Sequence, residues 1–173
     1  GNNTSGIVIG GENHTITNNT IHSIPRFALF LTEQRTWPYI YPNGNDISYN
    51  NIFNCVMFSR DAGCIYSGNI PTKGTKIHHN WIHDIQNIHP GPAADFTVNA
   101  IYFDEDTSGY SVYQNIIWNT GQDSIMIHGS TSGQTTNMDL SIYNNSIIDA
   151  NPKARINLQD VNYCGITRIA DNQ

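Results

Sequence analysis

The chain has 173 residues and a formal net charge of −6 at pH 7, and we treat residues 1–173 as a single domain. An acidic chain with no basic run is a poor partner for a phosphate backbone, so nucleic-acid binding is disfavoured. No apolar stretch reaches about 18 residues, which argues against a membrane-spanning helix. The 25 Ile and 23 Asn, against four Leu and eight Ala, favour strands and turns over helices.

A short template recurs five times along the chain. It consists of an aliphatic residue, two variable residues, Asn, one variable residue and Ile, and its successive Asn residues are 31, 30, 35 and 30 positions apart. This repeat predicts a β-solenoid, because a single coil cannot bury its apolar face and stacked coils can. The template Asn residues are Asn19, Asn50, Asn80, Asn115 and Asn145.

The template also predicts two aliphatic columns inside the solenoid, since identical branched side chains stack well on neighbouring parallel strands. We expect each Asn to lie between the columns and to adopt the left-handed conformation that turns one strand into the next. Its amide would then hydrogen-bond up the stack. The columns are Ile16, Ile47, Ile77, Val112 and Ile142, and Ile21, Ile52, Ile82, Ile117 and Ile147.

A further strand is expected after the template in each coil. Insertions around residues 60–63 and 89–95 precede it in the second and third coils, at the same corner of the solenoid, where such proteins commonly carry function. The stretch Tyr163–Ala170 predicts the start of a sixth coil. Because neither end shows a cap, we expect a fragment or the core of a longer protein with further domains. The expected strands are Ala28–Leu31, Cys64–Ser67, Asn99–Phe103, Ser124–His128 and Arg155–Leu158.

The densest acidic cluster, Asp104-Glu105-Asp106, ends the third of these strands. Aligning this strand with its equivalent in the next coil places Asp104 beside His128, because adjacent strands lie about 4.8 Å apart. A carboxylate in that position can orient or charge the imidazole, which is typical of an acid–base or substrate-binding site. The alternative interpretation is a solvated acidic turn.

Asp61, in the insertion of the second coil, is the second candidate carboxylate. It is either a positioned catalytic group beside Arg60, itself a candidate substrate-binding residue, or a turn residue with an Asx hydrogen bond. In the predicted register Asp104 pairs with Gly68, seven residues after Asp61, and a straight strand of that length spans about 23 Å. Glycosidase carboxylates lie about 5 to 9.5 Å apart, so pairing requires the insertion to fold back. We expect it to do so, with Asp61 and Asp104 lining one groove and their carboxyl carbons within about 10 Å of each other.

Aromatic side chains supply two candidate sugar-binding surfaces. Trp37, Tyr39 and Tyr41 lie in a loop after the last strand of the first coil, and their flat faces suit the apolar faces of sugar rings. The other surface is an outward column of residues, each one position beyond a core Ile. Two interpretations fit this column equally well: sugar binding, through His83 and Trp118, and packing against another domain. The column consists of His22, Phe53, His83, Trp118 and Ile148.

The sequence contains no zinc-binding pattern, and we predict no metal ligands. The three cysteines, Cys55, Cys64 and Cys164, cannot all pair with one another. We expect them to be buried small hydrophobes, with a single disulfide as the alternative.

Four segments together resemble right-handed parallel β-helix carbohydrate-active enzymes: Asp61–Gly68, Lys76–Asp84, Ala100–Gly109 and Val112–Asn115. They are most similar to the β-helical glycoside hydrolases that include fucosidases, xylanases and xylosidases. The resemblance implies an all-β solenoid that hydrolyses glycosidic bonds of a poly- or oligosaccharide, without a cofactor and in a secreted or periplasmic setting. It maps the two acidic residues of the family to Asp61 and Asp104, with Glu105 as a substitute, and His128 would tune Asp104.

Two other functions remain open. One is a calcium-dependent polysaccharide lyase on the same fold, with Asp104, Glu105 and Asp106 as oxygen ligands of Ca²⁺ and Lys76 or Arg60 as the base. The other is a non-catalytic sugar-binding or structural β-helix, because solenoids host many functions.

Overall fold

The structure is a computed structural model that describes residues 4–33, 40–85, 88, 98–105, 107–129, 139–148, 155–159 and 167–173. Every regular element in this part of the chain is a strand, and the strands pair in parallel to form three sheets. Sheet A contains β1 (Ser5–Ile9), β4 (Phe27–Leu31), β7 (Ala62–Gly68), β10 (Val98–Asp104), β13 (Ile125–His128) and β16 (Ile156–Gln159). Sheet B contains β2 (Thr15–Thr17), β5 (Asp46–Ser48), β8 (Pro71–His78), β11 (Ser108–Tyr113), β14 (Leu140–Tyr143) and β17 (Thr167–Ala170). Sheet C contains β3 (Thr20–His22), β6 (Asn51–Phe53), β9 (Trp81–Ile85), β12 (Ile116–Thr120) and β15 (Ser146–Ile148).

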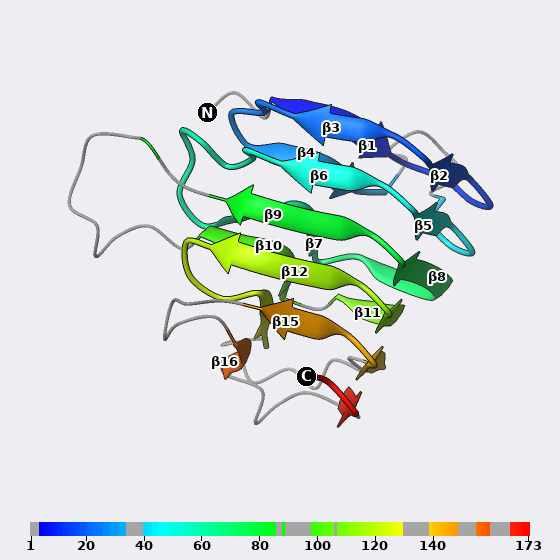
Figure 1. Cartoon of the computed structure of the whole chain (residues 1–173). Coiled ribbons are helices and arrows are strands. Elements are labelled where there is room, and N and C mark those ends of the chain that lie inside the picture. Colours follow the sequence, from blue (N-terminus) through cyan, green and yellow to red (C-terminus); the bar gives the residue numbers. More distant parts are fainter. Residues whose placement is uncertain are drawn as a thin grey trace.

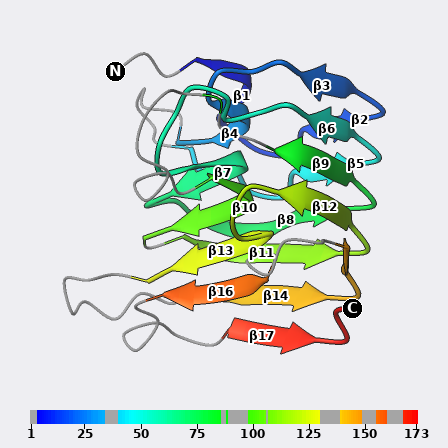
Figure 2. The same cartoon turned by 60° about the vertical axis from the view of Figure 1, so that its left-hand side comes forward.

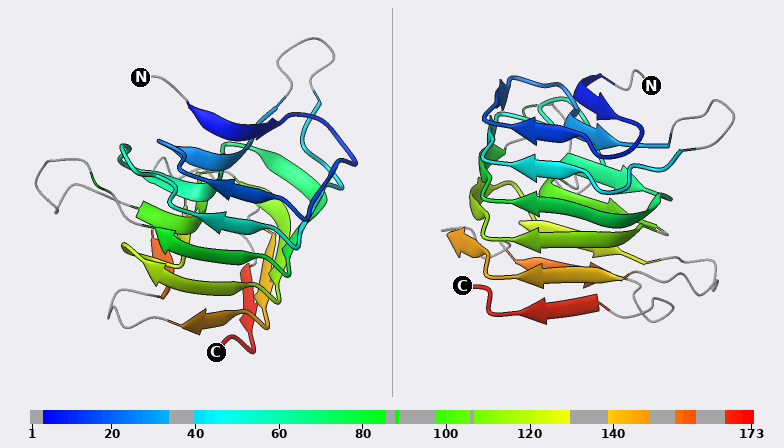
Figure 3. Two further views of the ribbon diagram at one scale, coloured as in Figure 1. Left: turned by 45° about the horizontal axis from the view of Figure 1, so that its top comes forward. Right: turned by 90° about the vertical axis from the view of Figure 1, so that its right-hand side faces the viewer.

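The three sheets enclose a core in a stack of coils. Figure 1 shows the strands of sheet C stacked one above another. Figure 2 shows that the strands of sheets A and B are stacked coil by coil in the same way. The two termini lie at opposite ends of the stack (Figure 3). This arrangement is a parallel β-helix, so the predicted all-β fold class is confirmed. The described residues include no helix that could cross a membrane.

The two predicted aliphatic columns lie in the core. Ile47 pairs with Ile77 on sheet B, and Ile52 pairs with Ile82 on sheet C, all four with no exposed surface. The columns continue at the far end of the stack to Ile142, which is buried, and to Ile147, which is half-buried. The further strands of the sequence prediction correspond to β4, β7, β10, β13 and β16 of sheet A, with bounds that differ by a few residues at most.

The template Asn residues form a buried asparagine ladder, consisting of Asn19, Asn50, Asn80, Asn115, Asn145 and, beyond the template, Asn172. Asn80, only 1% exposed, shows the pattern. Its Oδ1 accepts hydrogen bonds from the Asn50 backbone N and from Asn50 Nδ2, each at 3.0 Å. Its own Nδ2 donates to the carbonyl oxygen of Ile47 at 2.9 Å. The predicted bonding between stacked amides is therefore confirmed.

The left-handed turn residue is the one before each ladder Asn, so the prediction that the Asn itself adopts this conformation is wrong. The positive φ angles at this corner belong to Asn18 (57°), Tyr49 (54°), His79 (52°), Gln114 (53°), Asn144 (55°) and Asp171 (52°). The physical reason is that the ladder Asn points its side chain inward to bond its neighbours. The reversal of the chain then falls on the preceding residue.

A sixth coil is present, as the sequence predicts. β17 pairs with β14, and Asn172 Oδ1 accepts a hydrogen bond from Asn145 Nδ2 at 2.9 Å. The predicted start at Tyr163 lies outside the described residues. At the other end of the stack, β1 precedes the first template and pairs with β4; the template gave no signal for it.

The ladder yields a prediction about stability. In an Asn80→Ala variant, the backbone N and Nδ2 of Asn50 lose their acceptor inside the fold, and a buried unsatisfied group costs about 1–3 kcal/mol. We expect the free energy of unfolding, measured by urea denaturation, to fall by about 2–5 kcal/mol. Asn19→Ala, at the half-buried end of the ladder, is the matched control and should cost about 1 kcal/mol. Equal losses in the two variants would contradict the importance of the internal amide bonds.

Candidate functional site

The outer face of sheet A carries the predicted carboxylate site. β7 and β10 pair in the register expected from the sequence, with Tyr102 opposite Tyr66 and Asp104 opposite Gly68. Because side chains alternate between the two faces of a strand, Tyr102 and Asp104 both lie on the outer face. His128 lies on the neighbouring strand β13, and its Nδ1 is 2.8 Å from Asp104 Oδ1. The predicted contact between Asp104 and His128 is confirmed.

Polar groups converge on Asp104, whose side chain is only 16% exposed. Tyr66 Oη donates a hydrogen bond to Oδ2 at 2.8 Å. Oδ1 accepts from the Glu105 backbone N at 3.1 Å, lies 3.2 Å from Tyr102 Oη and also contacts His128. These contacts come from three successive coils, so the carboxylate is held in one orientation by the stacking of the solenoid.

Tyr102 connects the two predicted carboxylates. Its Oη lies 3.1 Å from Asp61 Oδ1 and 3.2 Å from Asp104 Oδ1, so these two carboxylate oxygens are at most 6.3 Å apart. The insertion therefore does not continue as the straight strand that the separation of about 23 Å assumes, and the expected approach of the two carboxylates is confirmed. A Cβ on Gly63 would lie only 2.8 Å from the Tyr102 Cβ, so the chain passes β10 more closely there than a residue with a side chain would permit. The length of the tyrosine side chain covers the remaining distance.

A cavity of about 270 Å³ opens between these residues. We call it the carboxylate cavity; it is lined by Asp61, Tyr102, Asp104, Glu105, Met126, His128 and Gln159. Tyr66, Tyr102, Met126 and Gln159 were not predicted as site residues. Their positions could have been found from the register, because Tyr66, Tyr102 and Met126 face one another on the outer side of sheet A, two residues before the row of Asp104 and His128, and Gln159 pairs with His128.

Burial, and next the negative charge of Asp104, raise the pKa of Tyr66 and Tyr102 far above the usual value for tyrosine. A phenolate beside a carboxylate in a partly dry site is disfavoured by both effects. Both hydroxyl groups therefore keep their protons at neutral pH and act as hydrogen-bond donors within the site.

Two further predicted substrate-binding residues lie on a different face of the solenoid. His83 stacks between Phe53 and Trp118 on sheet C, with ring centroids 5.2 Å from each. Its Nδ1 lies 2.8 Å from Asp84 Oδ2 and its Nε2 lies 2.9 Å from Asn51 Oδ1. Both faces and both nitrogens of the His83 ring are thus engaged, and these contacts do not support sugar stacking on His83. Trp118 is half-buried beside it.

The remaining predicted residues contribute less to the site. Arg60 is exposed and is not among the residues that line the carboxylate cavity. Trp37 and Tyr39 lie outside the described residues. Cys55 and Cys64 are both buried and free, as expected, and Cys164 also lies outside the described residues.

The calcium-dependent alternative rests on a cluster that the structure describes in part. Asp106, one of its three ligands, lies outside the described residues. Among the residues that are described, no group of three His, Cys, Asp or Glu side chains could hold a metal ion. Asp104 instead contacts hydroxyl, imidazole and backbone groups of the protein.

The comparison with protein families agrees with this fold. Residues 5–173 match the model of the right handed beta helix region. The chain therefore belongs to the right-handed β-helix family, which fixes the handedness of the coils. Right-handed β-helix domains occur in polysaccharide-active enzymes, among other proteins. No curated protein and no solved structure matches the chain.

The tyrosines of sheets A and B yield a prediction about pH. Burial raises the pKa of Tyr110, which is 1% exposed, as it does for Tyr102. In the unfolded chain a tyrosine loses its proton near pH 10, whereas the folded chain keeps it, so the unfolded state binds fewer protons above that pH. The resulting stabilisation is complete below pH about 10 and is lost as the pH rises, by up to about 1.4 kcal/mol per pH unit for each tyrosine.

The measurement is the free energy of unfolding in urea between pH about 9 and 11. Tyr110→Phe should reduce the steepness of the alkaline decline, because it removes one titrating group. A free energy of unfolding that stays constant over this range in the unmodified chain would show that the buried tyrosines titrate normally.

Proposed function

We propose that the chain hydrolyses glycosidic bonds of a poly- or oligosaccharide in the carboxylate cavity, with Asp61 and Asp104 as the two catalytic carboxyl groups. The observation that carries the proposal is the position of Tyr102 Oη, which is within hydrogen-bond distance of both carboxylates. Their oxygens are at most 6.3 Å apart, which is below the upper limit of about 9.5 Å for the two carboxyl groups of glycosidases. Membership of the right-handed β-helix family supports the carbohydrate class.

The surroundings of the two carboxyl groups support different roles. One hydroxyl carries one proton, so Tyr102 cannot donate to both carboxylates at the same time. Asp104 already faces a tyrosine hydroxyl, a backbone N–H and His128, so it is held in one orientation, which suits the group that acts on the sugar ring. Asp61 is exposed, and we assign it to the side of the leaving sugar.

In this assignment Asp61 protonates the oxygen of the leaving sugar, and Asp104 acts on the anomeric carbon, either directly or through a water molecule. His128 and Tyr66 hold Asp104 in place, and Glu105 lines the same cavity. The volume of about 270 Å³ is close to the lower limit of about 300 Å³ for small-molecule sites. We therefore assign to the cavity the sugar unit at the scissile bond and leave the rest of the polymer outside it.

The test is turnover of a panel of chromogenic glycosides and polysaccharides. Asp61→Asn and Asp104→Asn should each lower kcat by at least about a hundredfold, the lower end of acid–base effects, while substrate binding survives. Asp46→Asn is the matched control, because Asp46 lies on sheet B outside the carboxylate cavity; this change should leave turnover intact.

Two results would reject the proposal. The first is an absence of hydrolysis by the unmodified chain across the whole panel. The second is an equal loss of binding and turnover in the two variants, which would mean that Asp61 and Asp104 hold sugar without taking part in bond cleavage.

A further inference from the structure

Strand β8 bulges on sheet B, around the corner from the carboxylate cavity. Ser108 pairs with Pro71 and Tyr110 pairs with Thr75, so β8 advances by four residues where β11 advances by two. Gly74, inside the bulge, has a φ of 71°. A bulge of this kind redirects side chains and is over-represented next to binding sites.

Specific contacts hold the bulge in place. Thr72 Oγ1 lies 3.1 Å from the Ser108 carbonyl oxygen and 3.2 Å from that of Gly109, and it donates to this pair. Gly109 has a φ of 79°, and a Cβ there would lie 1.8 Å from the Thr72 carbonyl oxygen, so only glycine fits. On the other side, the Lys73 backbone N donates to Asn43 Oδ1 at 2.9 Å. The bulge is therefore a built feature of the fold.

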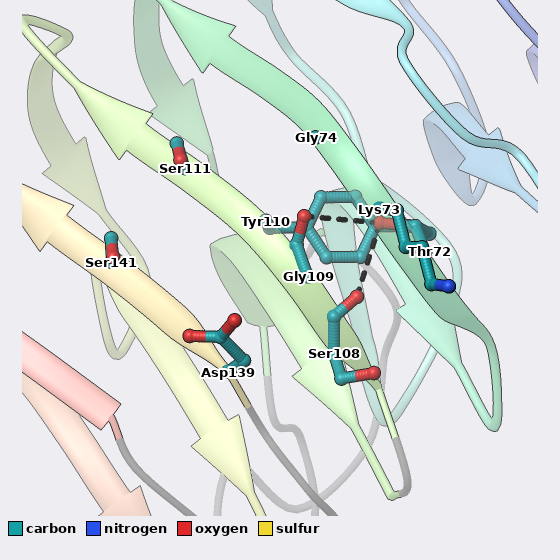
Figure 4. A pocket seen from close by; sticks show the side chains of 9 residues that line it. All are labelled: Thr72, Lys73, Gly74, Ser108, Gly109, Tyr110, Ser111, Asp139 and Ser141. Carbon is teal, nitrogen blue, oxygen red and sulfur yellow. Dashed lines mark hydrogen bonds between the residues drawn. The ribbon is translucent and has the colours of Figure 1, made fainter.

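The bulge forms one wall of a cavity of about 690 Å³, which we call the serine cavity (Figure 4). Ser111 of β11 and Ser141 of β14 lie along it, with Lys73 on one side and Asp139 on the other. Within the described part of the chain, no hydrogen bond or ion pair engages the side-chain polar groups of these four residues. The cavity thus presents hydroxyl, ammonium and carboxylate groups that are not committed to the fold.

A smaller cavity of about 250 Å³, the Tyr143 cavity, adjoins the serine cavity, because Ser141 lines both. One face of the Tyr143 ring stacks on Tyr113, with centroids 5.1 Å apart and planes 6° from parallel. The strand neighbour on the other side is Ala170, which has no ring to cover the second face. Arg168 completes the lining.

We propose that the serine cavity and the Tyr143 cavity together form a second binding site, which takes an oligosaccharide without cleaving it. Sugar hydroxyl groups match the uncommitted hydroxyl, ammonium and carboxylate groups, which donate and accept hydrogen bonds. The apolar face of a sugar ring matches the open face of Tyr143, because an aromatic side chain presents a large apolar surface. The volume of about 690 Å³ lies in the usual range of about 300–1,000 Å³ for ligand sites.

The position of this site relates it to the carboxylate cavity. Glu105 lines the carboxylate cavity and Ser108 lines the serine cavity, so the two linings are only three positions apart along the chain. A polysaccharide held at the second site would therefore be kept near the carboxylates. The inference goes beyond the proposed function, because binding at the second site requires no hydrolysis on sheet A.

The test uses the full chain with an Asp104→Asn change, so that the probes stay intact. The probes are xylohexaose, cellohexaose and hexagalacturonate, titrated to about 10 mM while amide signals are followed by NMR; this range covers weak affinities of a few kcal/mol. We expect at least one probe to shift the signals of Gly109, Ser111 and Ser141 in a saturable manner. Ser141→Trp, which fills the shared position, should weaken this binding at least about tenfold.

Ser146→Trp is the matched control, since Ser146 begins β15 on sheet C and the change should leave the affinity unaltered. If Ser141→Trp does not fold, the Lys73→Ala/Asp139→Ala double variant, with both changes at exposed residues, replaces it and should lower the affinity at least about tenfold.

Three results would overturn the inference: no shift at these amides with any probe, unchanged affinity in the variant that is used, or shifts confined to Tyr102 and His128. The last result would retain sheet A as the sugar site. Shifts on sheet B in the Asp104→Asn chain, together with no hydrolysis by the unmodified chain, would instead reject the proposed function and keep the second site.

Discussion

The asparagine ladder sets the geometry on which the rest of the structure depends. Each internal amide of the ladder bonds the coils on both sides, and in a low-dielectric interior such bonds are strong when every group is satisfied. The ladder fixes which residue of one coil stands beside which residue of the next. Tyr66 and His128, 38 and 24 positions from Asp104 in the sequence, reach its carboxylate because of that constraint. The left-handed residues before each Asn cost free energy, which the ladder bonds offset.

Both candidate sites arise where the chain departs from the repeat. The insertion that carries Asp61 lies before β7. The spacing between successive ladder Asn residues widens to 35 residues from Asn80 to Asn115, and Asp104 lies within this wider interval. The bulge in β8 is a third departure. Regular coils supply a rigid support, and local irregularities bring polar side chains together on it, which is how function is commonly placed on a scaffold.

Most of the fold could be predicted from the repeat in the sequence. Five template matches predicted the columns and the register, and the register in turn placed Asp104 next to His128. The pairing of Asp61 with Asp104 was expected, but the sequence could not show how it is achieved, because neither the close passage at Gly63 nor the reach of Tyr102 follows from the repeat.

The serine cavity illustrates another limit. A bulge changes the pairing of β8 without leaving a distinctive residue pattern, since Lys73 and Gly74 read equally well as an ordinary turn. Similarly, the sequence predicts a positive φ at the ladder Asn, whereas the residue before it has this conformation. Composition alone does not reveal which of two adjacent residues points its side chain inward.

The corner residues that precede the ladder have a consequence for surface chemistry. Asn18, Tyr49, His79, Gln114 and Asn144 share one backbone conformation and recur once per coil, yet their side chains include amides, a phenol and an imidazole. The ladder imposes the conformation from inside and leaves the identity of the outer residue free. Tyr49 and His79 already stack there at 4.9 Å, close to the strand spacing of about 4.8 Å. The corner therefore presents different chemical groups on the surface at intervals of one coil, while the interior keeps the same bonding.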